Sequence, residues 1–372
     1  MLQLLRESTP GYGGVERVAH VLGEYLGGVV LSLRLHPSNA SDAFATTYSR
    51  YWLPSVSIGR LLWPLPSPRL FLLLCSRRRL VVHLPCPTVL LLAVLARVLR
   101  PHRRIDVYWH AFLQPRAGLT GMFESTYQRF AVWLVRSFPV ITTSPLLRAS
   151  LLQVGFMAEQ VLVLPCVLSE SSDRVSTMIS SQRLSGLSKL LPCGSVIAIG
   201  RHDSYKRFDW LIAALAEAPA VRELHLVGDG PDRPRLEALA RQLPAHCASV
   251  HFHGRVSEAR KLELLSLADV LVLPADRCNE AFGIVQLEAM ACGIPALAFQ
   301  LPRSGMHWVS ALPALPWTGE PSELPAVLER LLRDPELYRQ ACLEARQRYE
   351  QEFGREVWCR RLAALGFQGA ES

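Results

Sequence analysis

Two glutamates eight positions apart, Glu280 and Glu288, lie in residues 279–291, which pass from an expected loop into an expected helix. Gly283 between them lets the backbone approach a ligand closely, and the first free N–H groups of the helix would suit a diphosphate. A carboxylate in the second helical turn accepts two hydrogen bonds, which suits a ribose diol. An ordinary helix whose acids offset the macrodipole is the alternative, and the pattern alone leaves both interpretations open.

A basic pair, Arg201 and Lys206, stands five positions apart in residues 200–207, directly after an expected strand. In an open α/β sheet, ligands bind outside the carboxyl ends of the strands. Two cations there would hold a diphosphate from two sides and neutralise the charge on a leaving nucleotide without a metal ion. A solvated basic loop is the alternative.

Two weaker signals lie in the N-terminal half. Residues 11–17 form a Gly-rich turn that contains Gly14, but they match neither G-x-G-x-x-G nor a Walker A motif. Neither a dinucleotide site nor an ATP-binding loop is therefore indicated. His110 follows an expected strand at residues 105–109, and a structural role for this single histidine stays open beside a catalytic one.

The elements that must position these residues alternate between strand-like and helix-period segments, which predicts an α/β protein with parallel sheets covered by helices on both faces. A length of 372 residues with 50% apolar composition predicts two domains. We place the first at residues 1–170, a serine-rich linker at 171–194 and the second domain at 195–340, followed by a helical segment at 341–372.

The individual elements follow from apolar periodicity and from Gly and Pro positions. Strands are expected at residues 2–5, 29–33, 80–84, 105–109, 140–143, 161–164, 195–199, 224–227, 250–252, 270–273 and 296–299. Helices are expected at residues 15–26, 88–99, 127–135, 209–217, 234–242, 258–266, 282–291, 321–332 and 335–365.

The charge is unevenly distributed. Residues 1–180 hold 18 Arg, no Lys and 9 acidic residues, a net +9, whereas the remainder holds 22 basic and 23 acidic residues, a net −1. This bias predicts an anionic partner for the first half. Nucleic acid would give the same bias, but the arginines interleave with leucines, which favours an anionic membrane surface over nucleic acid. Solvated arginines without a partner are the alternative.

A candidate membrane- or acceptor-facing patch lies early in the chain, with partial burial in the core as the alternative. Its members are Arg60, Leu61, Leu62, Trp63, Arg69 and Phe71.

Other features narrow the class of protein. Nine scattered cysteines without C-x-x-C spacing argue against a disulfide framework or a zinc cluster and favour a reducing, cytoplasmic setting. The first residues lack the apolar core of a secretory signal, and every long apolar run is interrupted by arginines. We expect a cytoplasmic protein, peripheral on the cytoplasmic face of the membrane, with no cofactor and no metal ion.

Several motifs together resemble the retaining, nucleotide-sugar GT-B glycosyltransferases (glycosyltransferase family 4-like, "glycosyl transferases group 1"). The resemblance is specific over residues 195–300 and looser before them. The motifs occur in the family's order: Gly200-Arg201 with Lys206, Gly228-Asp229-Gly230-Pro231, His253-Gly254-Arg255-Val256, Ala268-Asp269-Val270-Leu271-Val272-Leu273-Pro274, and Glu280-Ala281-Phe282-Gly283-Ile284-Val285 with Glu288-Ala289-Met290-Ala291.

What the resemblance implies can be carried over residue by residue. Arg201 and Lys206 match the basic pair on the donor diphosphate. Glu280 matches the acid that contacts the transferred sugar. Glu288 matches the acid on the donor ribose. The loop and helix start over the sugar and phosphates correspond to Phe282, Gly283, Ile284 and Val285.

Further donor contacts are implied by looser matches. Gly14 matches a glycine whose backbone faces the phosphate, and His110 a histidine near the 6-hydroxyl of the donor sugar, where its backbone or ring would stabilise an oxocarbenium ion. Arg255 and Val256 would lie beside the nucleobase. The sequence departs from the family at residues 303–307, where a Gly-Gly-x-x-Glu-like turn is usual.

The resemblance implies two Rossmann-like doubly wound domains facing each other across a cleft, with a last helix that returns to the first domain. It implies retaining transfer of a hexose from a nucleotide-sugar donor to a glycan, lipid-linked or small-molecule acceptor, in cell-surface polysaccharide or glycolipid synthesis. An epimerase-like or phosphorylase-like enzyme and a non-catalytic nucleotide-sugar-binding protein are the alternatives.

Overall fold

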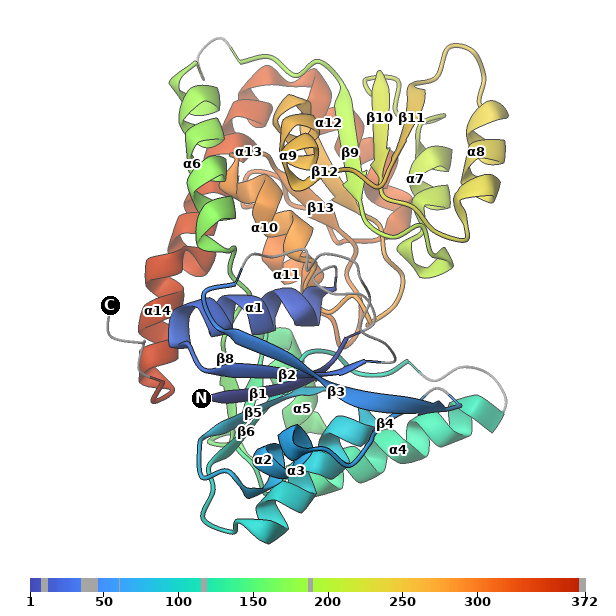
Figure 1. The fold of residues 1–372 in the computed structure, drawn as a ribbon. Helices are drawn as coiled ribbons and strands as arrows, with labels where there is room; N and C mark the ends of the chain where they lie inside the picture. Colours follow the sequence, from blue (N-terminus) through green and yellow to red (C-terminus); the bar gives the residue numbers. More distant parts are fainter. Residues whose placement is uncertain (8–12, 35–45, 60, 115–118, 187–189, 368–372) are drawn as a thin grey trace. The chain divides into compact units, whose positions relative to one another are not determined.

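The computed structural model describes residues 1–7, 13–34, 46–59, 61–114, 119–186 and 190–367. The chain divides into two compact units, and each has its own parallel sheet (Figure 1). Unit 1 comprises Met1–Val167 and Trp358–Ser372, and unit 2 comprises Leu168–Val357. Both units are α/β, as the alternating pattern predicts.

The sheet of unit 1 has the strand order β4-β3-β2-β1-β5-β6-β7-β8. All neighbouring strands are parallel except β3 and β4, which pair antiparallel. The strands are β1 (Leu2–Arg6), β2 (Val29–Arg34), β3 (Ser49–Ile58), β4 (Leu61–Pro64), β5 (Leu80–Leu84), β6 (Ile105–Trp109), β7 (Val140–Thr142) and β8 (Val161–Val163). The helices are α1 (Gly14–Leu26), α2 (Pro68–Cys75), α3 (Pro87–Leu99), α4 (Leu119–Val135), α5 (Pro145–Gln153) and most of α14 (Arg355–Ala364).

The connections of unit 1 place its helices on the two faces of the sheet. The chain steps from β1 through α1 to β2 in one direction, and from β5 through α3 and α4 to β7 in the other. Because parallel crossovers are right-handed, these two paths place their helices on opposite faces. Figure 1 shows α1 on one face of the sheet and α2, α3 and α4 on the other. The order reverses between β1 and β5, where an open sheet binds ligands beyond its carboxyl ends.

The sheet of unit 2 is wholly parallel, with the strand order β11-β10-β9-β12-β13. Its strands are β9 (Ser195–Ile199), β10 (Glu223–Val227), β11 (Ser249–Gly254), β12 (Val270–Leu273) and β13 (Ala296–Ala298). Its helices are α6 (Glu170–Ser185), α7 (Phe208–Ala214), α8 (Arg233–Arg241), α9 (Glu258–Leu267), α10 (Ile284–Ala291), α11 (Met306–Ser310), α12 (Leu324–Arg333) and α13 (Pro335–Arg348), with short turns η2 (Ser204–Lys206), η3 (Pro321–Glu323) and η4 (Tyr349–Phe353). Every residue of the central strands β9 and β12 is buried, which explains why all of them except Ser195 are apolar.

One carboxylate joins several elements of unit 2. Asp269, at the start of β12, accepts hydrogen bonds at Oδ2 from the backbone N–H groups of residues 193, 194 and 195, at 2.8, 2.8 and 2.9 Å. Its Oδ1 accepts one from the Tyr338 hydroxyl on α13 at 2.9 Å. Since Asp269 is 3% exposed, these bonds replace the hydration of its carboxylate. The presence of an aspartate in the Ala268-Asp269 motif is therefore explained by a structural role.

The structure also differs from the expected elements. Residues 170–185, within the serine-rich stretch, form helix α6 of unit 2, with Ser169 as its N-cap and Ser176 and Ser180 buried. The strands β3 and β4 and the helix α2 occupy a stretch for which no element was expected, and α4 begins at Leu119 rather than at residue 127. The expected helix 335–365 is interrupted, because Gly354 separates η4 from α14.

Candidate anion and sugar site

A buried ion pair stands at the carboxyl end of the sheet of unit 2. Lys206, in the η2 turn after β9, donates from Nζ to Oε2 of Glu280. Their side chains are 9% and 18% exposed. Burial opposes the charge of Lys206, but the Glu280 carboxylate together with Tyr205 and Asp203 outweighs this effect and raises the pKa of Lys206. At neutral pH the structure therefore holds an ammonium group against a carboxylate at the ligand-binding edge of the sheet.

Arg201, the other half of the expected basic pair, is differently placed. Its side chain is 66% exposed, and its Nε lies 3.2 Å from Oδ2 of Asp203. The loop that carries it packs tightly, because a Cβ on Gly228 would lie 1.9 Å from the Gly200 carbonyl oxygen and one on Gly230 would lie 2.4 Å from the His202 carbonyl oxygen. The Gly228-Asp229-Gly230 motif therefore supports the loop by close backbone contact.

The N-terminus of α10 has the geometry of an anion site. Gly283 precedes the helix with φ 73°, and a Cβ there would lie 2.3 Å from Leu273 Cδ2, so only glycine fits. No side chain caps this helix end within the part of the chain that the structure describes. The backbone N–H groups of Ile284 and Val285 are thus left for a ligand, and both residues are half-buried. Phe282 is buried beside them.

The segment at residues 303–307, where the sequence departs from the family pattern, supports this loop. Ser304 Oγ donates to the Glu280 carbonyl at 2.5 Å, and the Gly305 N–H donates to the Ala281 carbonyl at 2.7 Å. The segment contributes hydrogen bonds to the backbone of the loop rather than a carboxylate.

Glu288 has a partner that the sequence did not reveal. Glu288 is 1% exposed in the second turn of α10, and its Oε1 accepts a hydrogen bond from Lys261 Nζ on α9 at 2.8 Å. Lys261 is 6% exposed and also donates to Glu258 Oε2 at 2.6 Å. Lys261 lies in the first turn of α9, where a positive charge opposes the helix macrodipole. This unfavourable position is the only feature of the sequence that indicates an acidic partner for Lys261.

Arg255 and Val256 directly follow β11; Arg255 is exposed and Val256 is half-buried. Gly254 before them accepts a hydrogen bond from the Gly228 N–H at 2.8 Å. This bond brings the expected nucleobase contacts next to the loop after β10, so Arg255 and Val256 share the carboxyl edge of the sheet with Arg201, Lys206 and Glu280.

The two site residues expected in the N-terminal half, Gly14 and His110, belong to unit 1. Gly14 is the first residue of α1, and residues 11 and 12 of the Gly-rich turn lie outside the described residues. His110 follows β6, is 7% exposed and lies 2.8 Å from His83, between His110 Nε2 and His83 Nδ1. Burial, together with the neighbouring His83, places the pKa of His110 well below its usual value, so its ring is neutral.

The expected membrane- or acceptor-facing patch is only partly exposed. Leu62 is buried, Trp63 is half-buried, and Arg69 bonds the Trp52 carbonyl at 3.3 Å. Phe71 is 69% exposed, and residue 60 lies outside the described residues.

Within the described ranges, no group of three or more His, Cys, Asp or Glu side chains is arranged to hold a metal ion. No disulfide joins the nine cysteines. The expectation of a site without metal or cofactor stays a prediction.

Comparison with known proteins finds similarity in the second half of the chain. Residues 194–348 match the family model described as Glycosyl transferases group 1. A GDP-mannose-dependent alpha-(1-6)-phosphatidylinositol dimannoside mannosyltransferase of Mycobacterium tuberculosis is 31% identical over 156 residues, which are 42% of this chain and 38% of that protein. An N-acetyl-alpha-D-glucosaminyl L-malate synthase of Bacillus anthracis is 29% identical over 170 residues, 43% of this chain and 42% of that protein. The chain thus spans about two fifths of the length of these relatives.

Comparison with solved structures covers both units. Alr3699/HepE of Anabaena, solved in complex with UDP, has a TM-score of 0.72 and 20% identity over 98% of each chain. WaaG, described as a glycosyltransferase involved in lipopolysaccharide biosynthesis, has a TM-score of 0.63 and 18% identity over 98% of each chain. These likenesses show the fold, and they confirm the fold class that the motifs implied.

Proposed function

We propose that this chain, which has the GT-B fold and whose residues 194–348 match the model of the glycosyl transferases group 1, transfers a hexose from a nucleotide-sugar donor to an acceptor hydroxyl. The observation that carries the proposal is the Lys206–Glu280 pair beside the uncapped start of α10. A cation and free backbone N–H groups suit the diphosphate, and an adjacent carboxylate suits the sugar.

The proposed donor is a nucleoside diphosphate hexose. Arg201 and Lys206 hold its diphosphate, Glu288 its ribose, and Arg255 and Val256 border its base. Glu280 contacts the sugar, and residues 282–285 cover the sugar and phosphates. Support for such a donor comes from the relatives, since HepE was solved with UDP-glucose and the mycobacterial enzyme is named as GDP-mannose-dependent.

The proposed reaction retains the configuration at the anomeric carbon. The bond between C1 and the diphosphate oxygen breaks, C1 bonds to the acceptor oxygen on the same face, and the acceptor proton passes to the departing diphosphate. Lys206 and Arg201 neutralise the leaving group, and the protein supplies position and charge instead of a metal ion. As the diphosphate arrives, it competes for Lys206 and releases Glu280 toward the sugar.

The proposed acceptor is a glycan or a lipid-linked hydroxyl at an anionic membrane surface. No helix in the described ranges combines the length and apolarity that a membrane crossing requires. Unit 1 instead exposes an apolar–basic face, which we define as the outward side chains of α2, α3 and α4. Its apolar members are Phe71 and Leu72 on α2, Leu95, Val98 and Leu99 on α3, and Phe130 and Trp133 on α4.

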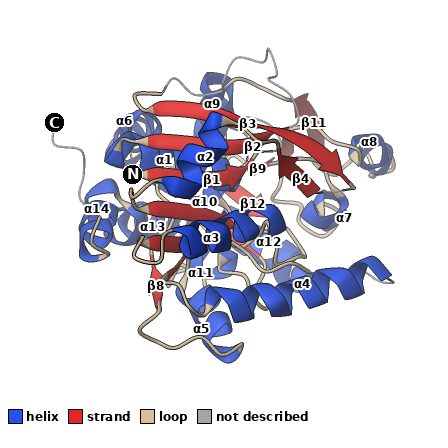
Figure 2. Cartoon of the chain, turned by 60° about the horizontal axis from the view of Figure 1, so that its bottom comes forward, coloured by secondary structure: helices blue, strands red, loops and turns tan. Residues whose placement is uncertain are grey.

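The three helices are neighbours, because α3 packs against both α2 and α4 (Figure 2). Phe71, Val98 and Trp133 are 69%, 68% and 64% exposed. Residues 51–140 contain 12 Arg and only 2 acidic residues, a net +10. An apolar surface with arginines and few carboxylates suits anionic lipid headgroups.

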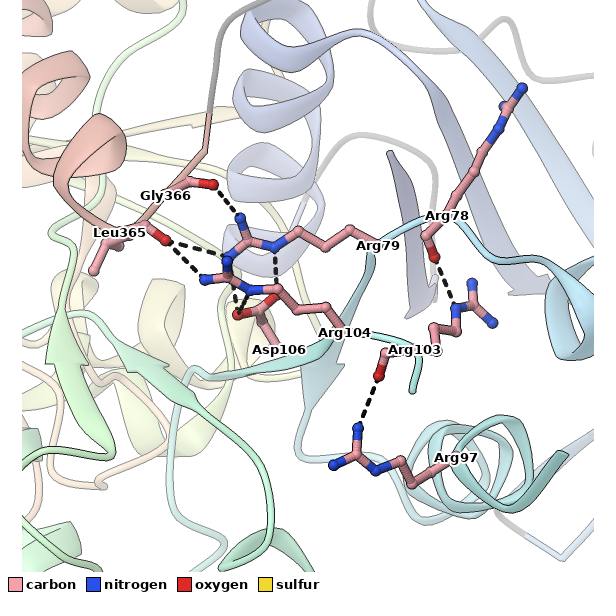
Figure 3. Close-up of polar contacts among 8 residues, drawn as sticks. All are labelled: Arg78, Arg79, Arg97, Arg103, Arg104, Asp106, Leu365 and Gly366. Atoms are coloured by element: carbon pink, nitrogen blue, oxygen red, sulfur yellow. Dashed lines mark hydrogen bonds and ion pairs between the residues drawn. The ribbon is translucent and has the colours of Figure 1, made fainter. Parts of the chain in front are cut away.

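Part of the arginine excess is structural. Arg79 binds Asp106 and the Gly366 carbonyl, Arg103 donates to the Arg78 carbonyl, and Arg97 donates to the Arg103 carbonyl (Figure 3). Arg103 also donates to the Leu73 carbonyl. Arginines whose guanidinium groups are bonded to backbone carbonyls are not all available to bind a membrane. The exposed side chains of Arg77 and Arg129 remain at the surface of the helical face and its ends, whereas Arg100 and Arg136, also exposed, donate to the Cys75 and Val154 carbonyls at 2.9 and 2.7 Å.

The test is turnover of a donor panel by the full chain. Purified protein is incubated with UDP- and GDP-hexoses, and nucleotide release is followed with and without glycan or lipid-linked acceptors. Glu280→Gln should lower turnover at least tenfold while leaving UDP or GDP affinity undiminished, because it removes the sugar contact and keeps the cation. Binding without turnover in the wild-type chain would favour the non-catalytic alternative, and equal turnover in the variant would remove Glu280 from the chemistry.

A further inference from the structure

A cavity of about 300 Å³ lies at the amino edge of the sheet of unit 1. Leu2, Leu80 and Ile105 stand opposite each other at the starts of the adjacent strands β1, β5 and β6, so the residues before them meet at this edge. The carboxyl ends of the strands, where open sheets bind their ligands, lie at the opposite edge. The residues that line the cavity are Met1, Leu26, Arg78, Arg79, Gly366 and Phe367.

One wall of the cavity is held in place by bonds within unit 1. Arg79 donates from Nε and Nη2 to the two carboxylate oxygens of Asp106, at 2.6 and 2.9 Å, and from Nη1 to the Gly366 carbonyl at 2.6 Å (Figure 3). The guanidinium carbon of Arg79 lies 3.3 Å from the centre of the Phe367 ring. The segment after α14 is thereby fixed against the turn before β5.

The charges at this edge do not balance. Arg79 and Arg104 share one carboxylate, since Arg104 Nε lies 3.6 Å from Oδ1 of the same Asp106. Arg78 adds a third positive charge, and none of the six described lining residues is acidic. Three guanidinium groups against one carboxylate leave a net charge of +2 beside the cavity. An anion is the ligand that this charge favours.

Arg78 is the cation that is available to such an anion. Its side chain is exposed, and within the described ranges no carboxylate or carbonyl accepts a hydrogen bond from its guanidinium group. Figure 3 shows this group directed away from Asp106 and the other arginines. The backbone of Arg78 is fixed, because its N–H donates to Ser76 Oγ at 3.1 Å and its carbonyl accepts from Arg103 Nε at 2.8 Å.

A phosphate group suits this arrangement. A guanidinium group forms two parallel hydrogen bonds to phosphate oxygens, and it does so with better geometry than an ammonium group. The volume of the cavity is at the low end of the range for small-molecule sites, which suits one phosphorylated group rather than a whole nucleotide sugar. Leu26 and Phe367 add an apolar wall beside the cations.

The surroundings favour a phosphate group that is carried by a lipid. The turn with Arg78 follows α2, and the loop with Arg104 follows α3, a helix that packs against α2. Leu72 on α2 is 56% exposed, and Val98 and Leu99 in the last turn of α3 are 68% and 51% exposed. A phospholipid would use both parts of this surface, its head group at the arginines and its acyl chains at the apolar side chains.

We infer that this cavity binds the phosphate group of an anionic phospholipid, with Arg78 as the principal contact. A built site of this kind holds unit 1 in one orientation on a membrane, which diffuse attraction between arginines and lipids does not. That the phosphate belongs to a lipid rests on the proposed function, in which the acceptor lies at a membrane surface; the phosphate site itself does not.

Two variants distinguish a site from diffuse charge. Leu26→Trp fills the cavity without changing the charge, whereas Arg77→Gln removes an exposed arginine that adjoins Arg78 but does not line the cavity. The probe is dihexanoyl phosphatidylglycerol below its micelle concentration, titrated calorimetrically into the full chain. Leu26→Trp and Arg78→Gln should each weaken binding roughly tenfold, and Arg77→Gln by less than about twofold.

Equal losses in Arg77→Gln and Arg78→Gln would overturn the inference, because attraction would then be diffuse. Unchanged binding in Arg78→Gln would overturn it as well, and this variant decides the matter if Leu26→Trp does not fold. Circular dichroism and urea unfolding check that each variant is folded.

Inorganic phosphate and glycerol 3-phosphate distinguish the sources of the phosphate group. The short-chain lipid should bind at least roughly tenfold more tightly than either, because its acyl chains add apolar contacts. Equal affinity for all three would overturn the lipid as the source, and no binding of any would overturn the phosphate site. Nucleotide release with a soluble acceptor should be the same in all variants, and its absence beside intact lipid binding would count against the proposed function alone.

Discussion

At the scale of single residues, the proposed donor site contains charges that already compensate each other in the absence of a ligand. Lys206 is held by Glu280, and Glu288 is held by Lys261. A buried ion pair contributes little net stability, because desolvation offsets the attraction between its members. Two such ion pairs on one edge of a sheet are therefore better explained by ligand binding than by a contribution to the stability of the fold.

Lys206→Met should weaken UDP and GDP binding by roughly 1.5–3 kcal/mol, the range for hydrogen bonds to charged groups. The variant removes the buried cation and leaves the exposed Arg201. Isothermal titration calorimetry measures the change. Arg241→Gln is the matched control, since Arg241 is an exposed arginine at the end of α8. Equal affinity in wild type and Lys206→Met would show that the diphosphate binds elsewhere.

Lys261→Met should lower the free energy of unfolding by about 3–5 kcal/mol, because it leaves the buried Glu288 carboxylate without its cation. Glu258→Gln, which changes the exposed partner of the same lysine, should cost about 1 kcal/mol or less. Urea unfolding measures both.

The double variant Lys261→Met/Glu288→Met separates stability from binding. It should regain most of the lost stability, since no charge is left buried. It should still fail to distinguish UDP from 2′-deoxy-UDP, because the proposed ribose contact is gone. Retained discrimination would assign Glu288 a structural role only.

At the scale of elements, unit 2 is fastened by carboxylate–backbone bonds that connect the starts of β9 and β12 with α13. Asp269→Ala should destabilise the chain by about 3 kcal/mol or more, since three backbone N–H groups lose a charged acceptor in a buried place. Asp334→Ala, which removes an exposed N-cap that bonds two N–H groups, should cost only about 1 kcal/mol. Similar losses in both variants, measured by urea unfolding, would contradict the central role of Asp269.

Elements built from local signals could be predicted from the sequence. The buried strands of both sheets are rich in apolar residues, and α10 has its glycine start, so these were expected at nearly their observed positions. The edge hairpin β3–β4 was not expected, because its residues are only partly buried and its apolar alternation is irregular. The many serines of α6 predict a linker, but this segment forms a helix in which Ser176 and Ser180 are buried.

The candidate site likewise contains residues that the sequence predicts and partners that it does not. Lys206, Glu280, Gly283 and Glu288 lie in short motifs that a sequence displays directly. The partner of Glu288 lies far away along the chain, since Lys261 is 27 residues from it. Such partners meet only when strands and helices pack, so residue types and spacing do not reveal them.

At the scale of the whole molecule, the two units differ in chemical character. Unit 2 contains the family motifs and is nearly neutral, whereas unit 1 carries the arginine excess and the apolar–basic face. If the proposed acceptor is embedded in a membrane, attraction of unit 1 to that surface would bring the chain to where the acceptor is concentrated.

Phe130→Ser/Trp133→Ser should reduce binding to vesicles of mixed phosphatidylcholine and phosphatidylglycerol by roughly tenfold or more. Both side chains are more than half exposed on α4, and their transfer into the headgroup region would be lost. The helix should remain folded, because the buried residues Ala131, Val132 and Val135 face the core.

Vesicle co-sedimentation at rising salt separates the apolar and electrostatic contributions. Binding of the wild type should fall between about 0.05 and 0.5 M salt, because arginine–lipid attraction is screened. The matched control is Leu267→Ser, which removes a leucine 64% exposed in unit 2 and should leave binding unchanged. Equal binding to pure phosphatidylcholine, or an equal loss in the control, would contradict a role for the apolar–basic face, and the exposed arginines would then be explained by solvation alone.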